Sequence, residues 1–350
     1  MRAARAGAVA MEETVERGAA AGRGIVPRGP AGPAADDARQ SPGSMALTMK
    51  TMTMARLQQL IALGLLALAG LWALAAVRAG HPAWAGAGLA AIVLGYGLFM
   101  ALEFAVMWVV HGDDPTPRAN LRRLLGAWWG AVCAGPRVFC WQQPFQSGRH
   151  PDHLPPEARA RAVLLVHGYV CNRGFWNRWM PRLRARGVPH LAVTLEPGFG
   201  SIQAYAIQID AAVRRLEQVT GRAPVIVAHS MGGLAVRAWM AAHEGAARVH
   251  RVVTLGTPHR GTWAARWGWT DNAREMRPGS ALLRALEAAE GESAHGRWTC
   301  YYSHCDNVVY PASTATLRGA DNRHVPGRAH VHLMDHGEVF EEVVRLAGEA

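Results

Sequence analysis

Lysine is almost absent from this sequence of 350 residues, in which Lys50 is the only one. Arginine therefore carries nearly all of the positive charge, and the net charge is +11. The arginines are scattered, without a block of consecutive basic residues or a nucleic-acid-binding motif. We therefore predict no nucleic-acid partner, and we expect the basic chain to be attracted to anionic lipid at a membrane surface.

The sequence also lacks the cysteine patterns of a metal site or a disulfide framework. Its five cysteines are odd in number, and none of them forms a CxxC pair. Cys300 and Cys305 are candidates for a bridge, but free buried thiols are the interpretation that we favour. The cysteines therefore indicate neither an oxidising nor a reducing compartment.

Residues 1–53 lack hydrophobic periodicity. They are rich in Ala, Gly, Arg and Pro, and the stretch GRGIVPRGPAGPAADD cannot bury a core, so we predict a disordered segment. A signal peptide is not expected, because the first apolar run comes too late and has no cleavage pattern. Met45 and Met54 leave a second interpretation open, in which translation starts downstream.

Charge is nearly missing from residues 54–112. One apolar run, 57–77, carries no charge, and a second, at about 83–110, carries only Glu103. Each run is long enough to span a bilayer, and the abundant Gly and Ala favour a transmembrane hairpin over a pair of buried soluble helices. Glu103 has three interpretations: an intramembrane functional carboxylate, a group near the interface, or a group paired within a bundle.

The charges beside the two runs predict their orientation. Lys50 and Arg56 precede the first run, Arg118, Arg122 and Arg123 follow the second, and the connection carries only Arg78. Basic residues flanking membrane spans stay on the cytoplasmic side. We therefore expect a multi-pass protein of the bacterial inner membrane whose following domain faces the cytoplasm.

Residues 113–136 link the hairpin to the rest of the chain. Apolar residues recur at helical spacing in RANLRRLLGAWWGAVCAGP, with arginines near the start and Pro136 at the end. This pattern is typical of an amphipathic helix at the membrane interface, and a packing helix of the following domain is the alternative.

Strand-like and helical segments alternate through residues 137–350. Residues 137–141 resemble an edge strand, and buried strands are predicted at AVLLVHG, PHLAVTLE, APVIVAHS and VHRVVTLGT. Helical segments separate them, so we predict an α/β fold with a mostly parallel sheet covered on both faces. An apolar insertion at about 262–297 is long enough for a small cap, which suits an acyl chain.

Ser230 stands where a predicted buried strand turns into a helix. It lies in Ala228-His229-Ser230-Met231-Gly232, which is the nucleophile elbow G-x-S-x-G with alanine at the first small position. The tight turn admits only small residues at the flanking positions, and alanine is small. A serine that merely caps the helix is the structural alternative.

A second strand ends at His167-Gly168 and supplies a candidate oxyanion site. Acyl transfer needs backbone N–H groups aimed at the developing negative charge. Gly168 permits a close approach of the chain, so the N–H groups of Tyr169 and Met231 are the candidate donors. His167 is expected to be a structural hydrogen-bonding group.

The candidate base and acid come later in the chain. Of the three histidines at 330, 332 and 336, His330 precedes an apolar run that leads into a terminal helix, where the base of such a sheet enzyme should lie. Asp306 follows a strand-like aromatic stretch and fits the order serine, acid, histidine. Asp321, in a polar stretch, is its rival and is interpreted as a solvated turn residue. A metal site at the three histidines is the alternative, although no complete ligand motif accompanies them.

Five motifs together resemble the bacterial lipase and esterase group of the α/β-hydrolase superfamily: VHG, AHSMGG, TLGTPHRGT, DNVVYP and AHVHL, which occur in this order over residues 137–350. The resemblance implies an α/β-hydrolase fold with Ser230 as nucleophile, Asp306 as acid and His330 as base. It places the oxyanion donors on Tyr169 and Met231, and it implies that GTPHRG shapes the pocket floor. No paired aspartates match the calcium site of some lipases, so neither a metal nor another cofactor is expected.

These expectations combine into a membrane-anchored serine hydrolase that cleaves carboxylic esters, either of lipids or of small molecules, through an acyl-enzyme on Ser230. One alternative is an acyltransferase that uses the same three residues and an acceptor alcohol. The other is a non-catalytic membrane protein that retains the fold.

Overall fold

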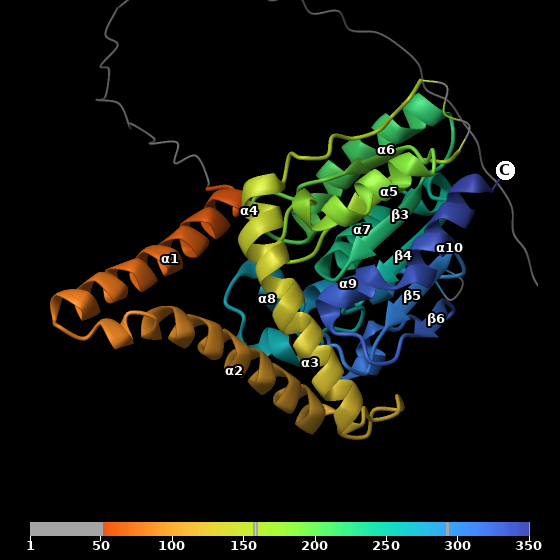
Figure 1. Ribbon diagram of the computed structural model, residues 1–350. Coiled ribbons are helices and arrows are strands. Elements are labelled where there is room, and N and C mark those ends of the chain that lie inside the picture. The colour runs from red at the N-terminus through yellow and green to blue at the C-terminus, as the bar shows by residue number, and fades with distance from the viewer. Residues whose placement is uncertain (1–51, 157, 159, 292–293, 350) are drawn as a thin grey trace, which may run out of the picture. The chain divides into compact units, whose positions relative to one another are not determined.

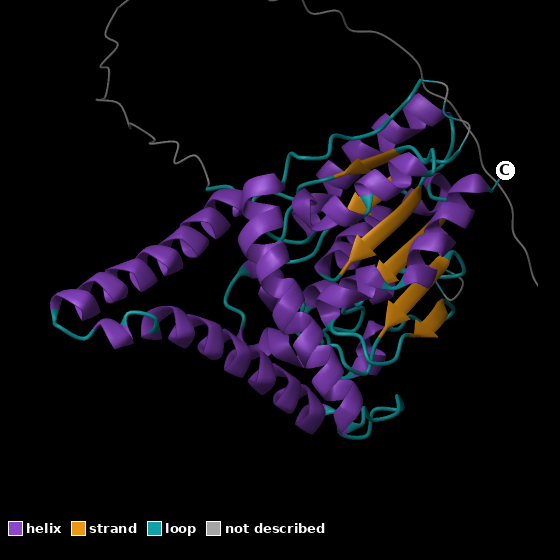
Figure 2. Cartoon of the chain, in the orientation of Figure 1, coloured by secondary structure: helices purple, strands orange, loops and turns teal. Residues whose placement is uncertain are grey.

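The computed structural model describes residues 52–156, 158, 160–291 and 294–349. All but the last two residues of the predicted disordered segment 1–53 lie outside the described residues. Among the described residues, only helices precede the first strand, which begins at Val163, and strands and helices alternate from there, as Figure 1 and Figure 2 show.

One parallel sheet forms the centre of the fold, and it confirms the predicted α/β architecture. Its strands lie in the order β2-β1-β3-β4-β5-β6, and all neighbouring pairs are parallel. The strands are β1 (Val163–Val166), β2 (His190–Ala192), β3 (Val225–His229), β4 (Arg251–Leu255), β5 (Trp298–Tyr302) and β6 (Asp321–His324).

Helices cover both faces of this sheet. The long ones that follow the first strand are α6 (Ala206–Thr220), α7 (Met231–Ala242), α9 (Ala281–Ala289) and α10 (Gly337–Gly348), and the shorter ones are α5 (Met180–Ala185) and α8 (Asp271–Glu275). Leu164 and Val166 of β1 pack in one core cluster with α6 and α7. Val163 and Leu165 pack in the other with α5 and α10, as expected when successive side chains of a strand point to opposite faces.

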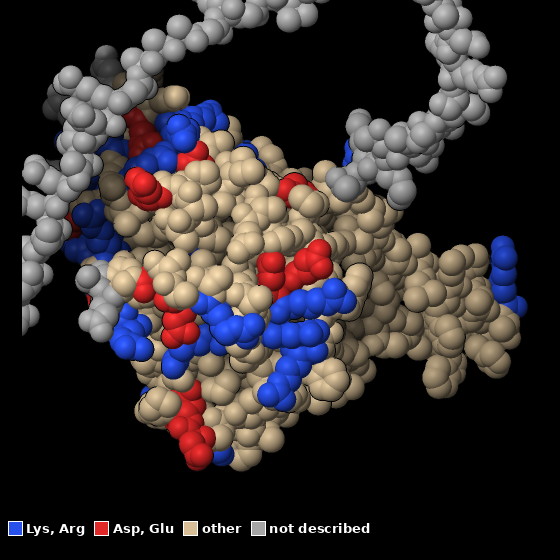
Figure 3. Space-filling view, turned by 180° about the vertical axis from the view of Figure 1, so that it is seen from behind, with Lys and Arg blue, Asp and Glu red and all other residues tan. Residues whose placement is uncertain are grey.

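The two apolar runs form helices α1 (Met54–Arg78) and α2 (Ala87–Val110), here called the hairpin. Both are long and apolar enough to cross a membrane by length and composition, which fits the prediction. The side chain of Thr53 accepts the N–H of Arg56 and caps α1. Figure 3 shows this part of the chain as a surface almost without charged side chains, whereas charges of both signs gather over the sheet and its helices.

The hairpin turns only a narrow stripe of residues inward. The buried residues of α1 are Met54, Gln58 and Ala62, which recur every four positions and therefore share one helix face. Its other side chains are mostly exposed, and Leu60 on the outer face is 61% exposed. An apolar helix with so little of its surface covered by protein has the properties of a lipid-facing segment.

The segment after the hairpin corrects one prediction. Helix α3 (Leu121–Gly135) is capped by Asn120, whose side chain accepts the N–H of Arg123. The expected edge strand at 137–141 is wrong, because these residues belong to a π-helical turn, η2 (Pro136–Gln142), that leads directly into α4 (Gln143–Gln146). Only Val138 of this stretch is buried, so its alternation of large and small residues does not come from a sheet.

Short helices occupy the predicted cap and the loops. The insertion between β4 and β5 contains η6 (Trp263–Trp267), α8 and α9. The remaining 3₁₀ turns are η1 (Pro82–Trp84), η3 (Arg173–Arg178), η4 (Gln203–Tyr205), η5 (Gly245–Arg248), η7 (Ala312–Ala315) and η8 (His330–Asp335). All five cysteines are free, and Cys300 and Cys305 are buried thiols as we expected.

Candidate active site

Ser230 lies in a strained turn between β3 and α7. Its backbone has φ 55° and ψ −130°, which an L-residue adopts only when its surroundings hold it there. The N–H of Ser230 donates to the carbonyl of Leu255 at 2.9 Å, and its carbonyl accepts from Gly233 at 3.0 Å. A Cβ at Gly232 would lie 2.5 Å from the carbonyl oxygen of His167, so the expected need for a small residue is met there.

The end of β1 approaches this turn closely. A Cβ at Gly168 would lie 2.8 Å from the Cβ of Ser230, so only glycine fits without a shift. The chain continues into Tyr169 and Val170, and Val170 has a positive φ of 54°. Within the described residues, the N–H groups of Tyr169 and Met231 donate no hydrogen bond, which leaves both of them available to an oxyanion.

His167 bridges two backbone segments. Its Nε2 accepts the N–H of Leu195 at 2.9 Å, so the proton is on Nδ1, which donates to the carbonyl of Gly168 at 2.8 Å. Complete burial lowers the pKa of His167 to about 4 and keeps the ring neutral. These contacts fit the structural role that we expected for this histidine.

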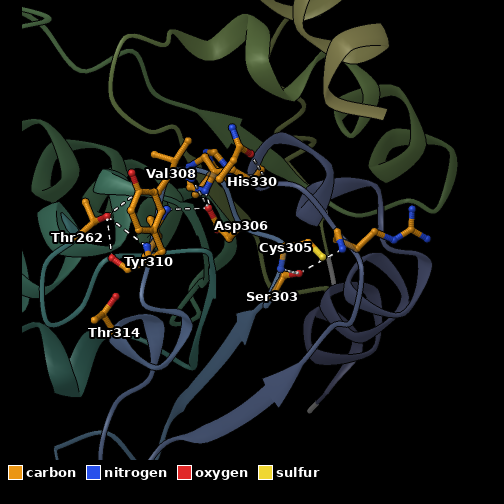
Figure 4. A network of polar contacts seen from close by, with 12 residues as sticks. Thr262, Ser303, Cys305, Asp306, Val308, Tyr310, Thr314 and His330 are labelled. Atoms are coloured by element: carbon orange, nitrogen blue, oxygen red, sulfur yellow. Dashed lines mark hydrogen bonds and ion pairs between the residues drawn. The ribbon is translucent and has the colours of Figure 1, made fainter. Parts of the chain in front are cut away.

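Asp306 and His330 form a buried pair. Nδ1 of His330 donates to Oδ2 of Asp306 at 2.8 Å, and Figure 4 shows the two side chains facing one another. The other carboxylate oxygen accepts the N–H groups of Val308 and Val309 at 2.9 and 2.7 Å. The carboxylate is therefore fixed from both sides, and it fixes the tautomer in which Nε2 of His330 carries a lone pair.

The buried pair lies beside the turn of Ser230. A Cβ at Gly256, just after β4, would lie 2.7 Å from Oδ2 of Asp306 and 3.1 Å from Nδ1 of His330. Nε2 of His229 lies 3.2 Å from the carbonyl oxygen of His330, and the two rings are 4.5 Å apart. The ends of the neighbouring strands β3 and β4 therefore place the turn of Ser230 close to the pair of Asp306 and His330, at the carboxyl edge of the sheet.

His229 is the histidine next to Ser230, and it is not a rival base. It is buried and stacks on Phe175 at a ring distance of 4.4 Å. Burial, together with the neighbouring His330, holds the pKa of His229 well below its ordinary value. Its neutral ring therefore acts as packing between the turn of Ser230 and the loop of His330.

The rival residues lie elsewhere. His332 contacts α3, where a Cβ at Gly130 would lie 2.4 Å from the imidazole. Asp321 is exposed and bonds Arg323, and its interpretation as a turn residue is wrong because it begins the edge strand β6. The strand is polar, so it lacks the apolar alternation by which a strand is recognised in a sequence.

The GTPHRG motif supports the loop that carries Asp306. Oγ1 of Thr262, which follows this motif directly, donates to the carbonyl of Val308 at 2.6 Å and accepts the N–H of Tyr310 at 3.2 Å, as Figure 4 shows. His259 is buried and bonds Thr254 at 3.1 Å. That the motif shapes the pocket floor stays a prediction, and the contacts of Thr262 brace the loop of the candidate acid.

Residues 163–328 match the family model described as the alpha/beta hydrolase family. The sheet and its covering helices form an alpha/beta-hydrolase domain. The matched range contains Ser230 and Asp306, and His330 follows its end by two residues. The described residues from 147 to 349 are called the hydrolase domain.

Solved structures similar to this chain include several lipases. The mature form of a lipase from Bacillus licheniformis is 18% identical, with a TM-score of 0.49, and the match covers 56% of this chain and 95% of that one. Lipase B from Aspergillus fumigatus is 18% identical with a TM-score of 0.45, and the match covers 49% of this chain and 47% of that one. A monoacylglycerol lipase from Paleococcus ferrophilus is 15% identical with a TM-score of 0.40, and the match covers 53% of this chain and 94% of that one. No curated protein matches the chain.

The hairpin contacts the hydrolase domain at the loops of the candidate site, which sequence reasoning did not predict. Nε2 of Gln58 in α1 donates to the carbonyl of Val170 at 3.0 Å. The same side chain accepts from Asn172 at 3.4 Å and faces Gln143 of α4. A polar residue inside an apolar helix needs a partner, and this was the only pattern in the sequence that could have singled out Gln58.

Glu103 of α2 also contacts the site. Its Oε2 accepts Nδ2 of Asn307 at 2.7 Å, and Asn307 directly follows Asp306. The partner of this carboxylate therefore belongs to the hydrolase domain and not to the other helix of the hairpin.

Proposed function

We propose that this chain is a serine hydrolase that cleaves carboxylic esters through an acyl-enzyme on Ser230. The observation that carries the proposal is the strained turn of Ser230 beside the buried pair of His330 and Asp306. Acyl transfer requires a nucleophile, a base and an orienting acid close together, and Ser230, His330 and Asp306 are our candidates for these three roles. The motifs shared with bacterial lipases and esterases support the same reaction.

Each residue then has a defined role. Oγ of Ser230 attacks the ester carbonyl carbon and passes its proton to Nε2 of His330, whose imidazolium form Asp306 stabilises. The N–H groups of Tyr169 and Met231 stabilise the oxyanion. The imidazolium returns the proton to the leaving alcohol, and water, activated by His330, then cleaves the acyl-enzyme and regenerates Ser230.

We propose a lipid ester as substrate, because an apolar surface suited to contact with lipid lies next to the candidate site. The exposed outer faces of α1 and α2 are suited to hydrocarbon, and their inner residues reach the loops of the candidate site. Trp267 and Trp269, in the insertion between β4 and β5, are 77% and 76% exposed. Tryptophan is favoured at the membrane–water interface, so these exposed side chains are suited to contact with lipid.

Covalent labelling tests the proposal. Full-length protein in detergent is treated with a fluorophosphonate, the labelled peptide is mapped, and hydrolysis of esters of graded acyl length and of phospholipids is measured. We expect labelling of Ser230 and a fall in hydrolysis of about 10³-fold or more in Ser230→Ala, with an unchanged fold. An unlabelled wild-type protein that hydrolyses no ester would refute the proposal, and ester products formed only with an added alcohol would identify an acyltransferase.

The proposed reaction takes its nucleophile, base and oxyanion donors from the chain itself. We therefore expect hydrolysis to persist in excess chelator. Activity that is lost with chelator and restored by calcium would contradict this expectation.

We further propose that the hairpin spans the bacterial inner membrane with the hydrolase domain in the cytoplasm. The basic residues at both outer ends of the hairpin support this orientation, against Arg78 alone at the connection. The substrate would then be an inner-leaflet lipid or a cytosolic ester. A reporter that is active only in the periplasm, fused after Ala350, should give no activity, and strong activity there would reverse the orientation.

A further inference from the structure

Glu103 is the one acidic residue in the two helices of the hairpin, and it does not lie on their lipid-facing side. Its chain neighbour Phe104 and the next turn's Met107 are each 5% exposed, whereas Leu102 is 61% exposed. The carboxylate is therefore on the side of α2 that faces the hydrolase domain. A charge is costly in an apolar segment, so its retention there needs a specific partner.

Asn307 is that partner, and it joins α2 to the candidate base. It is 5% exposed, its Nδ2 donates to Oε2 of Glu103 at 2.7 Å, and its Oδ1 accepts the backbone N–H of His330 at 3.4 Å. The two ends of one buried amide thus bind a membrane helix and the residue that carries the imidazole. Asn307 also follows Asp306 directly in the chain, so it is connected to both Asp306 and His330.

The hydrogen-bonding chemistry of a carboxyl group explains why an acidic residue at position 103 is a suitable partner for Asn307. The carboxyl group of Glu103 offers an acceptor oxygen, and this oxygen holds the NH₂ group of Asn307 toward α2. The carbonyl oxygen of the amide must then face the N–H of His330. Without this acceptor, the buried NH₂ group would lack a partner, and the amide would have no fixed orientation.

We propose that Glu103 is a positioning residue for His330, acting through Asn307, and that the hairpin therefore takes part in building the active site. The inference rests on the proposed function, since it assigns Glu103 to the acid–base pair of that reaction. The carboxylate bonds Asn307 and, within the described residues, forms no hydrogen bond with Ser230, Asp306 or His330, so we expect it to act on the placement of the imidazole. Substrate binding should therefore depend little on it.

The test uses the full-length protein in detergent with Glu103→Leu, Glu103→Gln and the control Leu102→Ala. Active sites are counted by fluorophosphonate labelling, and kcat per labelled site and KM are measured with a soluble ester. We expect Glu103→Leu to lower kcat about tenfold, as for loss of a buried charged hydrogen-bond partner, with KM changed by less than about twofold. Glu103→Gln keeps an acceptor oxygen and should recover most of that loss, and Leu102→Ala should behave like the wild type.

A double variant separates positioning from general damage to the fold. If Glu103 acts through Asn307, Glu103→Leu combined with Asn307→Leu should lower kcat no further than Asn307→Leu alone. Additive losses would overturn the proposal, as would a Glu103→Leu protein with fewer labelled sites but wild-type kcat per site. A wild-type protein that neither labels nor hydrolyses would instead overturn the proposed function, and this inference with it.

Discussion

The hairpin and the hydrolase domain differ in which side chains they bury and which they expose. The hydrolase domain buries large apolar side chains such as Trp176, Trp179 and Trp239 completely. The hairpin leaves most of its leucines exposed, and the residue at the centre of its buried stripe is the polar Gln58. Burial of apolar surface stabilises a domain in water, whereas a lipid-facing helix gains nothing from turning leucine inward.

The difference shows what the inner side of the hairpin contributes. Its polar contacts with the hydrolase domain include one at Val170, in the loop of the candidate oxyanion donor Tyr169, and one at Asn307, beside the candidate acid. A helix that served only as a tether would need neither contact. The comparison therefore predicts large effects at the site, smaller effects on the inner side of the hairpin, and almost none on its outer side.

The largest effect should come from His330. His330→Ala removes the proposed base, and we expect kcat/KM for ester hydrolysis to fall about 10³-fold or more. His332→Ala is the matched control, because its ring contacts α3 at Gly130, and its effect should stay below about tenfold. A mild His330→Ala together with an inactive His332→Ala would reverse the assignment of the base.

The next effect concerns the stability of the hydrolase domain at low pH. The pKa of His167 is about 4 in the folded chain and 6.5 for the free side chain, so between these values only the unfolded chain binds the proton. The contribution of the neutral His167 to the free energy of unfolding is complete above pH 6.5. It falls by about 1.4 kcal/mol per pH unit, or about 3 kcal/mol in total, as the pH drops to 4.

Chemical unfolding in detergent, followed by tryptophan fluorescence from pH 7 to 4, measures this loss. His167→Gln removes the proton that His167 binds on unfolding. The free energy of unfolding of the variant should therefore fall less steeply as the pH drops, with a slope smaller by about one proton. Equal slopes in the two proteins would mean that His167 is protonated in the folded chain.

Gln58 should have a smaller effect, on the inner side of the hairpin. Gln58→Leu removes the hydrogen bond to Val170, and we expect kcat to fall about tenfold as the oxyanion loop loses a buried partner. Gln59→Leu is the matched control, because this neighbouring glutamine bonds Pro144 in α4 instead of the loop. Equal losses in the two variants would show that the hairpin acts on overall packing and not on the oxyanion loop.

Sequence reasoning predicted the centre of the fold because local pattern and chemistry coincide there. Val225 to Ala228 form an apolar run that leads to Ser230, with small residues two positions before and two positions after the serine. This combination indicates both a strand and a turn. The alternation of strands and helices then predicts a parallel sheet, whose carboxyl ends meet at one edge. Residues assigned to successive loops at that edge are therefore expected to lie together.

The remaining features depend on contacts between distant parts of the chain. Glu103 and Asn307 are 204 residues apart in sequence, and no local pattern relates a carboxylate in one helix to an amide in a later loop. The edge strand predicted at 137–141 was wrong for a different reason. Helix α3 continues through Pro136 as a π-helical turn, which keeps Phe139 and Trp141 on the outside. A short alternating run fits a strand and such a turn equally well.

The smallest effect is expected on the outer face of the hairpin, at Leu60. Its side chain is 61% exposed, and α1 without it remains apolar and long enough to span a bilayer, so Leu60→Ala should change kcat and KM by less than about twofold. Ala62→Leu is the inward counterpart, because Ala62 is 8% exposed and a larger side chain there must displace packed neighbours. It should lower the unfolding temperature in detergent, while Leu60→Ala should not. If Leu60→Ala lowered that temperature as much, the outer face would be covered by protein, as in a second copy of the chain, and the contrast between a lipid-facing and a site-facing side of α1 would be lost.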